Sequence, residues 1–406
     1  MKKVLNFKSI ITLLFTFTLS AVIDSQNTSR VPTKYYDPGV IIGGITWATR
    51  NVGEPGTFAA RPESSGMFYQ WGSNVGWSAT DPLVSSNGGR SWVDIDSPGE
   101  KWTSANDPCP AGWRIPTGYE MSILIGSGHS WTSNYNNTGV AGRLFGTAPN
   151  RIFTPAAGVR NYSNDNTGKL GYSGSDFGVW CNTIEVFLKV ENDDTYVSQV
   201  SKHTGLNVRC VKLDKQMGMS STDDKGVTIG GVVWATRNVD KPGTFAARPE
   251  NPGMFYQWNI RVGWNADELI NSNGERTWNE YQSPLMKWET ANDPCPAGWR
   301  IPTEEELKTL ININSVWTGD GRLFGNFPNQ IFLPAAGHLY SSKFYKLRHQ
   351  GTGVGTYTAS TKPYIKPGDN SLDDKAVCSL TFYNERIYAY FWWPYREAIS
   401  VRCVKK

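Results

Sequence analysis

Two identical stretches of the chain contain residues that could do chemistry. Residues 105–117 and 291–303 both read ANDPCPAGWRIPT, and each contains a cysteine. A glutamate follows three residues after the final threonine of each stretch, at Glu120 and Glu306. A carboxyl group at the same distance after both stretches could act as a general acid or base. The repetition raises the question of whether a catalytic signature or a structural feature occurs twice.

The spacing of threonine and glutamate also fits the start of a helix. In a Thr-x-x-Glu capping box, the side chain of Thr117 or Thr303 accepts a hydrogen bond from the first turn. The carboxylate of Glu120 or Glu306 then accepts one from the backbone N–H of that threonine. The proline before each threonine favours an extended backbone just ahead of the helix. We therefore predict a capped helix after each stretch, with catalytic acids as the alternative.

Four of the six cysteines occupy matching positions. Cys109 and Cys295 lie in the identical stretches, and Cys210 and Cys403 lie in the closing sequences NVRCVK and SVRCVK. We predict the disulfides Cys109–Cys210 and Cys295–Cys403. Each would close a loop of about 100 residues, for which chain entropy gives roughly 4–5 kcal/mol before strain is subtracted.

The two remaining cysteines do not match each other. Alignment of ENDDTY with YNERIY places Cys378 opposite Val186, so Cys181 has no cysteine counterpart. We expect both to be small buried side chains, and a link between the two halves of the chain is the alternative. No two cysteines form a C-x-x-C pair, which argues against zinc ribbons and thioredoxin-type redox sites.

Other residues that could do chemistry form no recognisable site. The four histidines do not recur between the matching segments and lack metal-binding spacing: His129, His203, His338 and His349. No G-x-S-x-G motif occurs. The acidic run at 369–374 lacks the glycine and the final glutamate of an EF-hand and is expected to be a solvated loop. We therefore predict no metal, no cofactor and no enzymatic activity.

The segments that must position these residues are written twice. Residues 44–71 return as 231–258, 101–117 as 287–303, 152–158 as 331–337, and 207–212 as 400–405. A period of roughly 190 residues is far beyond that of a solenoid repeat. We predict a signal peptide at 1–25, an N-terminal segment at 26–38, repeat 1 at 39–212, a linker at 213–225 and repeat 2 at 226–406. Short β-branched and apolar runs predict strands in both repeats.

The N-terminus has the pattern of an export signal. Lys2, Lys3 and Lys8 precede a largely apolar run from residue 10 to 23. A membrane anchor is the alternative, but the run is shorter than the about 20 apolar residues of a membrane-spanning helix. We expect an exported protein of the cell surface, periplasm or extracellular space, with no transmembrane helix in the mature chain. A net charge of +4 without a basic block predicts no nucleic-acid partner.

A family resemblance rests on three segments. CPAGWRIPT, PAAG and VRCVK together resemble the Fibrobacter succinogenes major paralogous domain family, in two tandem copies. That family occurs in exported and surface proteins of Bacteroidota. RIPTEEELKTL (300–310) and SVRC (400–403) are also similar to the C-type-lectin-like fold, including the formylglycine-generating-enzyme family. The resemblance implies an α+β fold of two tandem C-type-lectin-like domains. Each would have short twisted antiparallel sheets, one or two helices and long irregular loops.

The chain departs from the active members of that fold. The formylglycine-generating oxidases use two cysteines a few residues apart, whereas each repeat here has one unmatched cysteine, so an oxidase is the least favoured function. Calcium-dependent lectins use a Glu-Pro-Asn or Gln-Pro-Asp motif. Glu250, Asn251 and Pro252 have a different order and lie too early in repeat 2. The resemblance therefore carries over a fold and no catalytic or calcium-binding residue.

An aromatic segment of repeat 2 is the candidate ligand surface. In IYAYFWWPYRE (387–397), strand alternation places Tyr388, Tyr390 and Trp392 on one face and Trp393 on the other. Repeat 1 has TYVSQV in that place, so the fold does not require these rings. We predict that four aromatic residues contribute to a ligand surface: Tyr390, Trp392, Trp393 and Tyr395. The alternative is that they fill the core or the contact between the domains.

Four tryptophans recur at matching places and are predicted to belong to the scaffold: Trp77, Trp92, Trp264 and Trp278. The function that best fits the sequence is an exported, non-catalytic binding or adhesion protein that recognises a glycan or another extracellular polymer. The alternative is a structural component of a surface or appendage with protein partners. The sequence leaves the oligomeric state open.

Overall fold

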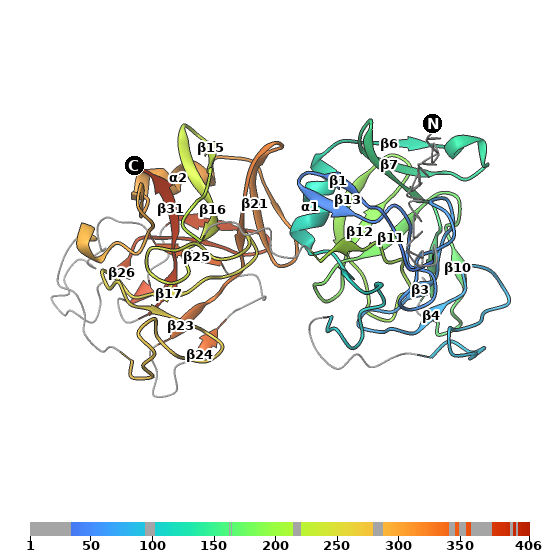
Figure 1. Ribbon diagram of the computed structural model, residues 1–406, viewed down its shortest axis with the longest axis horizontal. Helices are drawn as coiled ribbons and strands as arrows, with labels where there is room; N and C mark the ends of the chain where they lie inside the picture. Colours follow the sequence, from blue (N-terminus) through green and yellow to red (C-terminus); the bar gives the residue numbers. More distant parts are fainter. Residues whose placement is uncertain are drawn as a thin grey trace, which may run out of the picture.

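The computed structural model shows two lobes, one from each repeat (Figure 1). It describes residues 34–93, 102–161, 163, 165–213, 221–278, 287–340, 346–348, 355–358, 376–389, 393–394 and 397–406. The predicted signal peptide lies outside these residues, as do Tyr390, Trp392 and Tyr395. Only the backbone of Trp393 is described. The lobes meet where helix α1 (Gly118–Gly126) of repeat 1 faces strand β21 (Gly321–Asn326) of repeat 2.

Repeat 1 consists of small antiparallel sheets and a single α-helix within the described residues. One sheet pairs the strands at both ends of the repeat: β1 (Val40–Ile42), β2 (Ile45–Trp47), β14 (Val211–Lys212) and β5 (Trp113–Arg114). Two three-stranded sheets follow: β6 (His129–Thr132), β7 (Gly142–Thr147) and β8 (Asn150–Pro155), and β11 (Phe177–Trp180), β12 (Val186–Val190) and β13 (Thr195–Gln199). The rest are strand pairs and a 3-10 turn: β3 (Phe68–Tyr69) with β4 (Gly76–Trp77), β9 (Val159–Arg160) with β10 (Leu170–Gly171), and η1 (Tyr135–Asn137).

Repeat 2 has the same plan. Its terminal strands pair in one sheet: β15 (Val227–Ile229), β16 (Val232–Asn238), β31 (Arg402–Lys405) and β19 (Trp299–Arg300). A larger sheet contains β18 (Gly263–Trp264), β17 (Phe255–Tyr256), β30 (Ile399–Ser400), β25 (Gly355–Thr358), β27 (Ser379–Phe382) and β28 (Ile387–Ala389). The others are β20 (Ser315–Trp317), β21 and β22 (Asn329–Pro334), β23 (His338–Tyr340) with β24 (Lys346–Arg348), and β26 (Ala376–Val377) with β29 (Trp393–Pro394). Helix α2 (Glu304–Ile311) and η2 (Thr290–Asn292) complete it.

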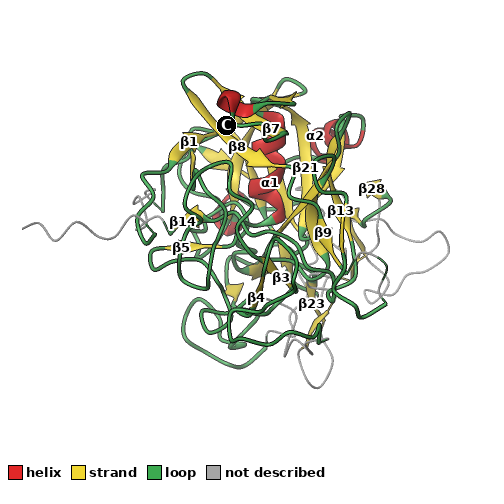
Figure 2. Ribbon diagram, turned by 90° about the vertical axis from the view of Figure 1, so that its right-hand side faces the viewer, coloured by secondary structure: helices red, strands yellow, loops and turns green. Residues whose placement is uncertain are grey.

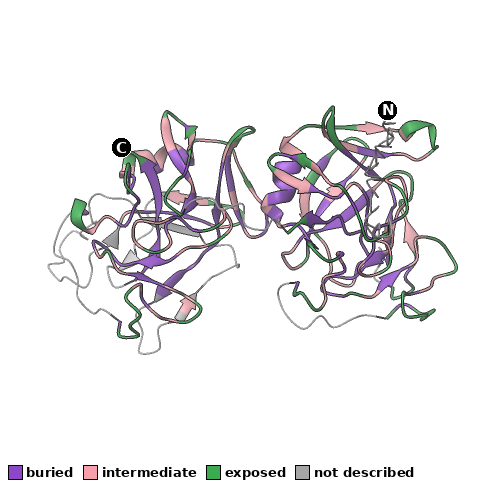
Figure 3. Ribbon diagram, viewed as in Figure 1, coloured by how far each residue is buried: buried purple, intermediate pink, exposed green. Residues whose placement is uncertain are grey.

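The fold class is thus a sheet-rich α+β fold with long loops, as predicted. Figure 2 shows short strands and abundant loop around the helices α1 and α2. Buried residues fill the centre of each lobe (Figure 3). The predicted scaffold role of the four recurring tryptophans is confirmed, because Trp77 and Trp92 are buried with ring centroids 5.0 Å apart. Trp264 and Trp278 are likewise buried at 4.8 Å.

In each repeat, a buried arginine of the closing VRC sequence donates hydrogen bonds to the asparagine of the TRN sequence near the start of the repeat. Arg209 donates from Nε and Nη2 to the Asn51 side-chain oxygen at 2.9 and 2.7 Å, and from Nη2 to the Phe153 carbonyl. Arg402 donates to the Asn238 side-chain oxygen at 2.8 Å in the same way. A buried guanidinium is tolerated because fixed acceptors satisfy it. The repeated TRN and VRC sequences therefore form one structural contact.

Both predicted helices have their capping boxes. The hydroxyl of Thr117 accepts from the N–H of Glu120 at 3.1 Å, and the Glu120 carboxylate accepts from the N–H of Thr117 at 2.8 Å. Thr303 and Glu306 form the same pair at 3.2 and 2.8 Å. In the part of the chain that is described, no helix is long and apolar enough to cross a membrane.

Candidate functional site

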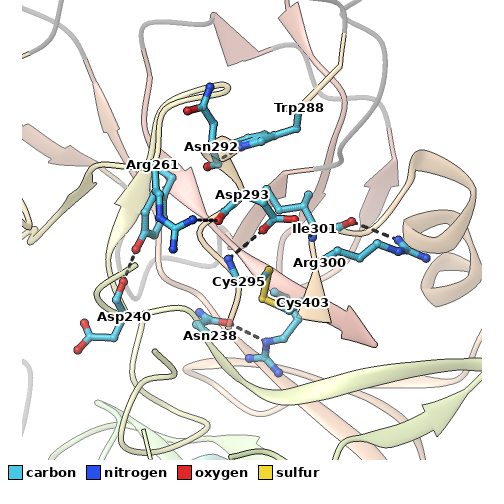
Figure 4. The surroundings of a disulfide bond; sticks show 12 residues. Asn238, Asp240, Arg261, Trp288, Asn292, Asp293, Cys295, Arg300, Ile301 and Cys403 are labelled. Atoms are coloured by element: carbon cyan, nitrogen blue, oxygen red, sulfur yellow. Dashed lines mark hydrogen bonds between the residues drawn. A yellow bond between two sulfur atoms is a disulfide. The ribbon is translucent and has the colours of Figure 1, made fainter. Parts of the chain in front are cut away.

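The identical stretches, called the clasps below, are structural units. The predicted disulfides are confirmed: Cys109–Cys210 and Cys295–Cys403 have Cα atoms 6.0 Å apart. Figure 4 shows the second disulfide with Asp293 beside it. The Asp293 carboxylate accepts from the N–H groups of Cys295 and Ile301 at 2.9 and 3.2 Å. The clasp therefore holds the cysteine and the strand that follows it in a fixed geometry.

The clasp glutamates are engaged as caps. Arg114 donates to both carboxylate oxygens of Glu120 at 2.7 and 2.6 Å, and Arg300 binds Glu306 in the same bidentate way. Partial burial raises the pKa of Glu306, but hydrogen bonds from Arg300 and the Thr303 backbone outweigh it and leave the pKa below its ordinary value. These contacts favour the ionised, structural form over a proton-donating acid.

The other residues examined for chemistry are dispersed. Within the described ranges, no group of three or more His, Cys, Asp or Glu side chains could hold a metal ion. Cys181 is a buried thiol and Cys378 a partly buried one, and neither is in a disulfide. His129 lies 2.9 Å from the Arg143 guanidinium, and burial followed by this cation lowers its pKa. The run at 369–374 and His349 lie outside the described residues.

A cavity of about 260 Å³ in repeat 1 is the best candidate for a binding site. It lies beside the β11–β12–β13 sheet, and its lining is mixed. The lining includes three buried apolar side chains, which are Phe177, Phe187 and Leu206. It also includes two charged side chains, Lys189 and Glu191. Its other lining residues are Val159, Tyr172, Asp176, Val200 and Thr204. Apolar surface with a few placed polar groups is the usual character of a ligand site.

An exposed tyrosine is held at the rim of this cavity in an unusual backbone conformation. Tyr172 has a φ of +59° and remains 54% exposed. Its carbonyl accepts from the N–H groups of Ser175 and Asp176 at 3.1 and 3.0 Å, and from the Ser175 hydroxyl at 3.1 Å. A bulky residue at positive φ is an outlier of the kind that occurs at functional sites. The turn therefore fixes the backbone of an aromatic residue that solvent can reach.

A charged pair lies on the same side of the sheet. Lys189 Nζ is 2.5 Å from the Glu191 carboxylate and 5.6 Å from the centre of the Tyr196 ring. Hydrogen bonding to Glu191 raises the pKa of Lys189, although partial burial opposes it. Lys189 is thus a cation at neutral pH, and together the pair offers hydrogen-bond donors and acceptors beside the cavity.

An arginine of the repeated GRLFG segment holds the hairpin that carries Glu191 through hydrogen bonds to its backbone. Arg143 on β7 donates to the carbonyls of Glu191 and Asn192, the latter at 3.0 Å. In repeat 2, Arg322 on β21 donates to the carbonyls of Tyr383 and Asn384 at 3.1 and 3.0 Å. Because the acceptors are backbone carbonyls, these hydrogen bonds can form whichever side chains the hairpin carries.

The side chains of this arginine-bound hairpin differ between the repeats. Repeat 1 has Glu-Asn-Asp-Asp at 191–194, and repeat 2 has Tyr-Asn-Glu-Arg at 383–386. A concave surface in repeat 2 is lined by Tyr383, Asn384, Glu385, Arg386 and Tyr388. The Tyr383 and Tyr388 rings meet edge to face with centroids 6.0 Å apart. Each repeat therefore presents charged and aromatic groups from one equivalent hairpin.

Two positions that line the repeat 1 cavity carry larger polar side chains in repeat 2. The repeat alignment places Val159 and Thr204, which line the cavity, opposite His338 and Glu397. His338 and Glu397 are both buried, with Nε2 and the carboxylate 3.6 Å apart. A buried polar pair thus occupies positions where repeat 1 has small side chains beside a cavity. Among the described residues, the two repeats therefore differ at these cavity-lining positions as well as in hairpin sequence.

The predicted aromatic ligand residues align with the cavity region. Extension of the ENDDTY–YNERIY alignment places Tyr390 opposite Ser198 and Trp392 opposite Val200, which lines the repeat 1 cavity. Tyr172, Lys189 and Glu191 were not identified from the sequence. The signal for Tyr172 was weak, because a tyrosine in a Gly-Tyr-Ser-Gly turn has nothing to distinguish it until its φ is known. Comparisons with protein-family models, curated proteins and solved structures find no match for the chain.

Proposed function

We propose that the protein is an exported, non-catalytic binding protein that recognises a glycan or another extracellular polymer, with the repeat 1 cavity as one binding site. The observation that carries this proposal is the exposed Tyr172 ring at the rim of a cavity with an apolar floor and a Lys189–Glu191 pair. An aromatic face can stack on a sugar ring, while the charged pair exchanges hydrogen bonds with its hydroxyls. Use of Glu120 and Glu306 as caps supports a non-catalytic role.

The size of the cavity fits a segment of polymer rather than a large ligand. Its volume of about 260 Å³ lies just below the range of about 300–1,000 Å³ that is typical of ligand sites. One or two units of a chain would occupy it, with the rest of the polymer on the exposed rim. The proposal extends to repeat 2, where the hairpin surface and the aromatic segment 387–397 would bind a different part of the polymer or a different ligand.

The proposed architecture is C-type-lectin-like. The pairing of β1, β2 and β14 brings the two ends of repeat 1 together, and β15, β16 and β31 do the same in repeat 2. A capped helix follows each clasp, and long loops carry the variable residues. These features support the resemblance drawn from RIPTEEELKTL and SVRC, in which long loops carry binding function.

The proposal is tested by glycan-array screening of the full chain, followed by titration of the polysaccharide that binds best. Tyr172→Ala is expected to weaken that binding at least about tenfold, a loss of about 1.4 kcal/mol. Tyr36→Ala is the matched control, because Tyr36 is also exposed, at 58%, and does not line the cavity. Unchanged affinity of Tyr172→Ala would assign the binding to another surface, and absence of any polysaccharide ligand would favour a protein partner.

A further inference from the structure

Helix α1 of repeat 1 docks on the β20–β21–β22 face of repeat 2. The Tyr119 ring packs on the Phe332 ring with centroids 4.8 Å apart and an interplanar angle of 34°. Burial raises the pKa of Tyr119, and the nearby Arg402 guanidinium opposes this rise. Arg402 donates to the Phe332 carbonyl at 2.9 Å. The docking position is therefore defined by a tyrosine that lies over a buried phenylalanine and next to a buried arginine.

In repeat 1, the surface equivalent to this docking position is covered by a residue of repeat 1 itself. Phe153 is the equivalent of Phe332, and the Tyr135 ring stacks on it with centroids 3.9 Å apart and an interplanar angle of 2°. Arg209, the equivalent of Arg402, donates to the Phe153 carbonyl at 3.0 Å and interacts electrostatically with Tyr135. Tyr135 thus reproduces, within one repeat, the position that Tyr119 takes between repeats.

Tyr135 comes from a segment that repeat 2 lacks. Between the matching Trp-Thr and Gly-Arg-Leu-Phe-Gly sequences, repeat 1 has nine residues, 133–141, where repeat 2 has only Gly319 and Asp320. The segment closes on itself, because the Tyr135 N–H donates to the Val140 carbonyl at 2.9 Å. A further difference is Ala148, which stands where repeat 2 has Phe327, and Phe327 lies under Gly126 of the docked helix.

The helix that would dock is also changed in repeat 2. Gly118, Tyr119 and Gly126 of α1 contact repeat 2, and Ser122 lies on the same helix face by its spacing. Charged or amide residues replace all four in α2: Gly118 becomes Glu304, Tyr119 becomes Glu305, Ser122 becomes Lys308 and Gly126 becomes Asn312. A Cβ atom at Gly118 would lie 1.9 Å from the Thr318 carbonyl oxygen. In α2, Lys308 pairs with Glu304 and Glu305 at 2.8 and 3.0 Å. The α2 helix therefore cannot approach a neighbouring repeat as closely.

We infer that the two repeats share one head-to-tail docking mode and that residues 133–141 are a built-in cap, which closes the docking face of repeat 1 with Tyr135. The partner that this face fits is the helix of another such repeat, from a second copy of the chain. A head-to-tail contact propagates into filaments unless both ends are blocked. The cap blocks one end and the charged α2 helix blocks the other. This inference is independent of the proposed ligand binding.

Two variants of the full chain test the inference. The uncapped variant replaces residues 133–141 with Gly-Asp and carries Ala148→Phe. The donor variant carries Glu304→Gly, Glu305→Tyr, Lys308→Ser and Asn312→Gly. Each alone should remain a single chain in sedimentation velocity, because it has only one open end. An equimolar mixture should form a complex of two chains. Because the natural contact is intramolecular, the experiment extends to about 1 mM, the effective concentration that a short linker provides.

Two comparisons make each outcome decisive. The donor variant should not associate with the wild-type chain, because the cap of the wild type is in place. It should associate weakly with a chain that carries only Tyr135→Ala, because that change opens the docking face in part. A donor variant with Glu305→Ala instead of Glu305→Tyr should lose this association. Circular dichroism establishes that each variant is folded. Folded uncapped and donor variants that fail to associate at about 1 mM would overturn the shared docking mode, and association of the donor with wild type would overturn the cap.

Discussion

At the scale of single residues, the clasps are identical because their polar atoms are used by the fold. Asp107 accepts from the N–H groups of Cys109 and Ile115 at 2.8 and 3.1 Å, and Asp293 does the same in repeat 2. Burial raises the pKa of both aspartates, although these N–H groups lower it. Loss of such a carboxylate would leave two backbone donors without their partner, which costs about 1–3 kcal/mol each when they are buried. Substitutions in the clasps therefore change stability rather than ligand choice.

The cysteines give a prediction at this scale. Of six cysteines, four are in disulfides, which leaves Cys181 and Cys378 as thiols. Burial raises the pKa of Cys378 to about 12 and that of Cys181 further still. Since the thiolate is the reactive form, both should react slowly with iodoacetamide in the native protein at pH 8. Mass spectrometry should find two labels after denaturation without reductant and six after reduction, and four or more without reductant would contradict the disulfides.

At the scale of elements, local spacing and internal repetition predicted the structure best. Thr-x-x-Glu predicted both helix starts, and matched cysteines predicted both disulfides, because local spacing or repetition fixes the answer. The repeat 1 cavity depends on where distant segments meet, so its lining was not predicted. The sequence of α1 does indicate that this helix packs against a second surface. GYEMSILIG lacks the charged face of EEELKTLI, and a helix without a polar face is buried all round.

This contrast between the helices gives a prediction for Gly118. Alanine ordinarily stabilises a helix by about 1 kcal/mol relative to glycine. In Gly118→Ala, however, the new Cβ would meet the Thr318 carbonyl oxygen at 1.9 Å, so the repeats must separate. We expect a net loss of about 1–3 kcal/mol in docking, seen as an increased radius of gyration in small-angle X-ray scattering. Glu304→Ala, at the equivalent position of α2, is the control and should leave the radius unchanged.

At the scale of the whole molecule, the junction between the lobes brings three carboxyl groups together. Glu250 of repeat 2 accepts a hydrogen bond from the Thr117 hydroxyl at 3.3 Å, and Asp320 accepts one from Thr318 at 2.8 Å. Glu120, the helix cap of α1, is the third, and it is paired with Arg114. Burial and then the charge of Glu120 raise the pKa of Glu250, which Arg114 and Arg248 partly offset. Docking therefore gathers negative charge that solvent would otherwise screen.

The stability of the junction should consequently fall as the pH rises. Burial raises the pKa of Asp320 from 3.8 to about 7, and the charges of Glu250 and Glu120 add to this rise while Thr318 opposes it. An acid with a raised pKa in the docked state holds its proton there between about pH 4 and pH 7, where the undocked state has lost it. The docked state is thus fully favoured below about pH 4, weakens as the pH rises through about 7, and is constant above that.

Hydrogen exchange of the α1 amides, corrected for intrinsic rates, measures this effect. Protection should be lower at pH 8 than at pH 5 by at least about 1 kcal/mol, because one pKa unit corresponds to about 1.4 kcal/mol. Asp320→Asn keeps an acceptor for Thr318 but cannot ionise, so it should remove most of the pH dependence and strengthen docking at pH 8. Glu306→Gln, in the equivalent cap of repeat 2 and away from the junction, should leave the dependence intact. Equal slopes in wild type and Asp320→Asn would show that Asp320 does not control the junction.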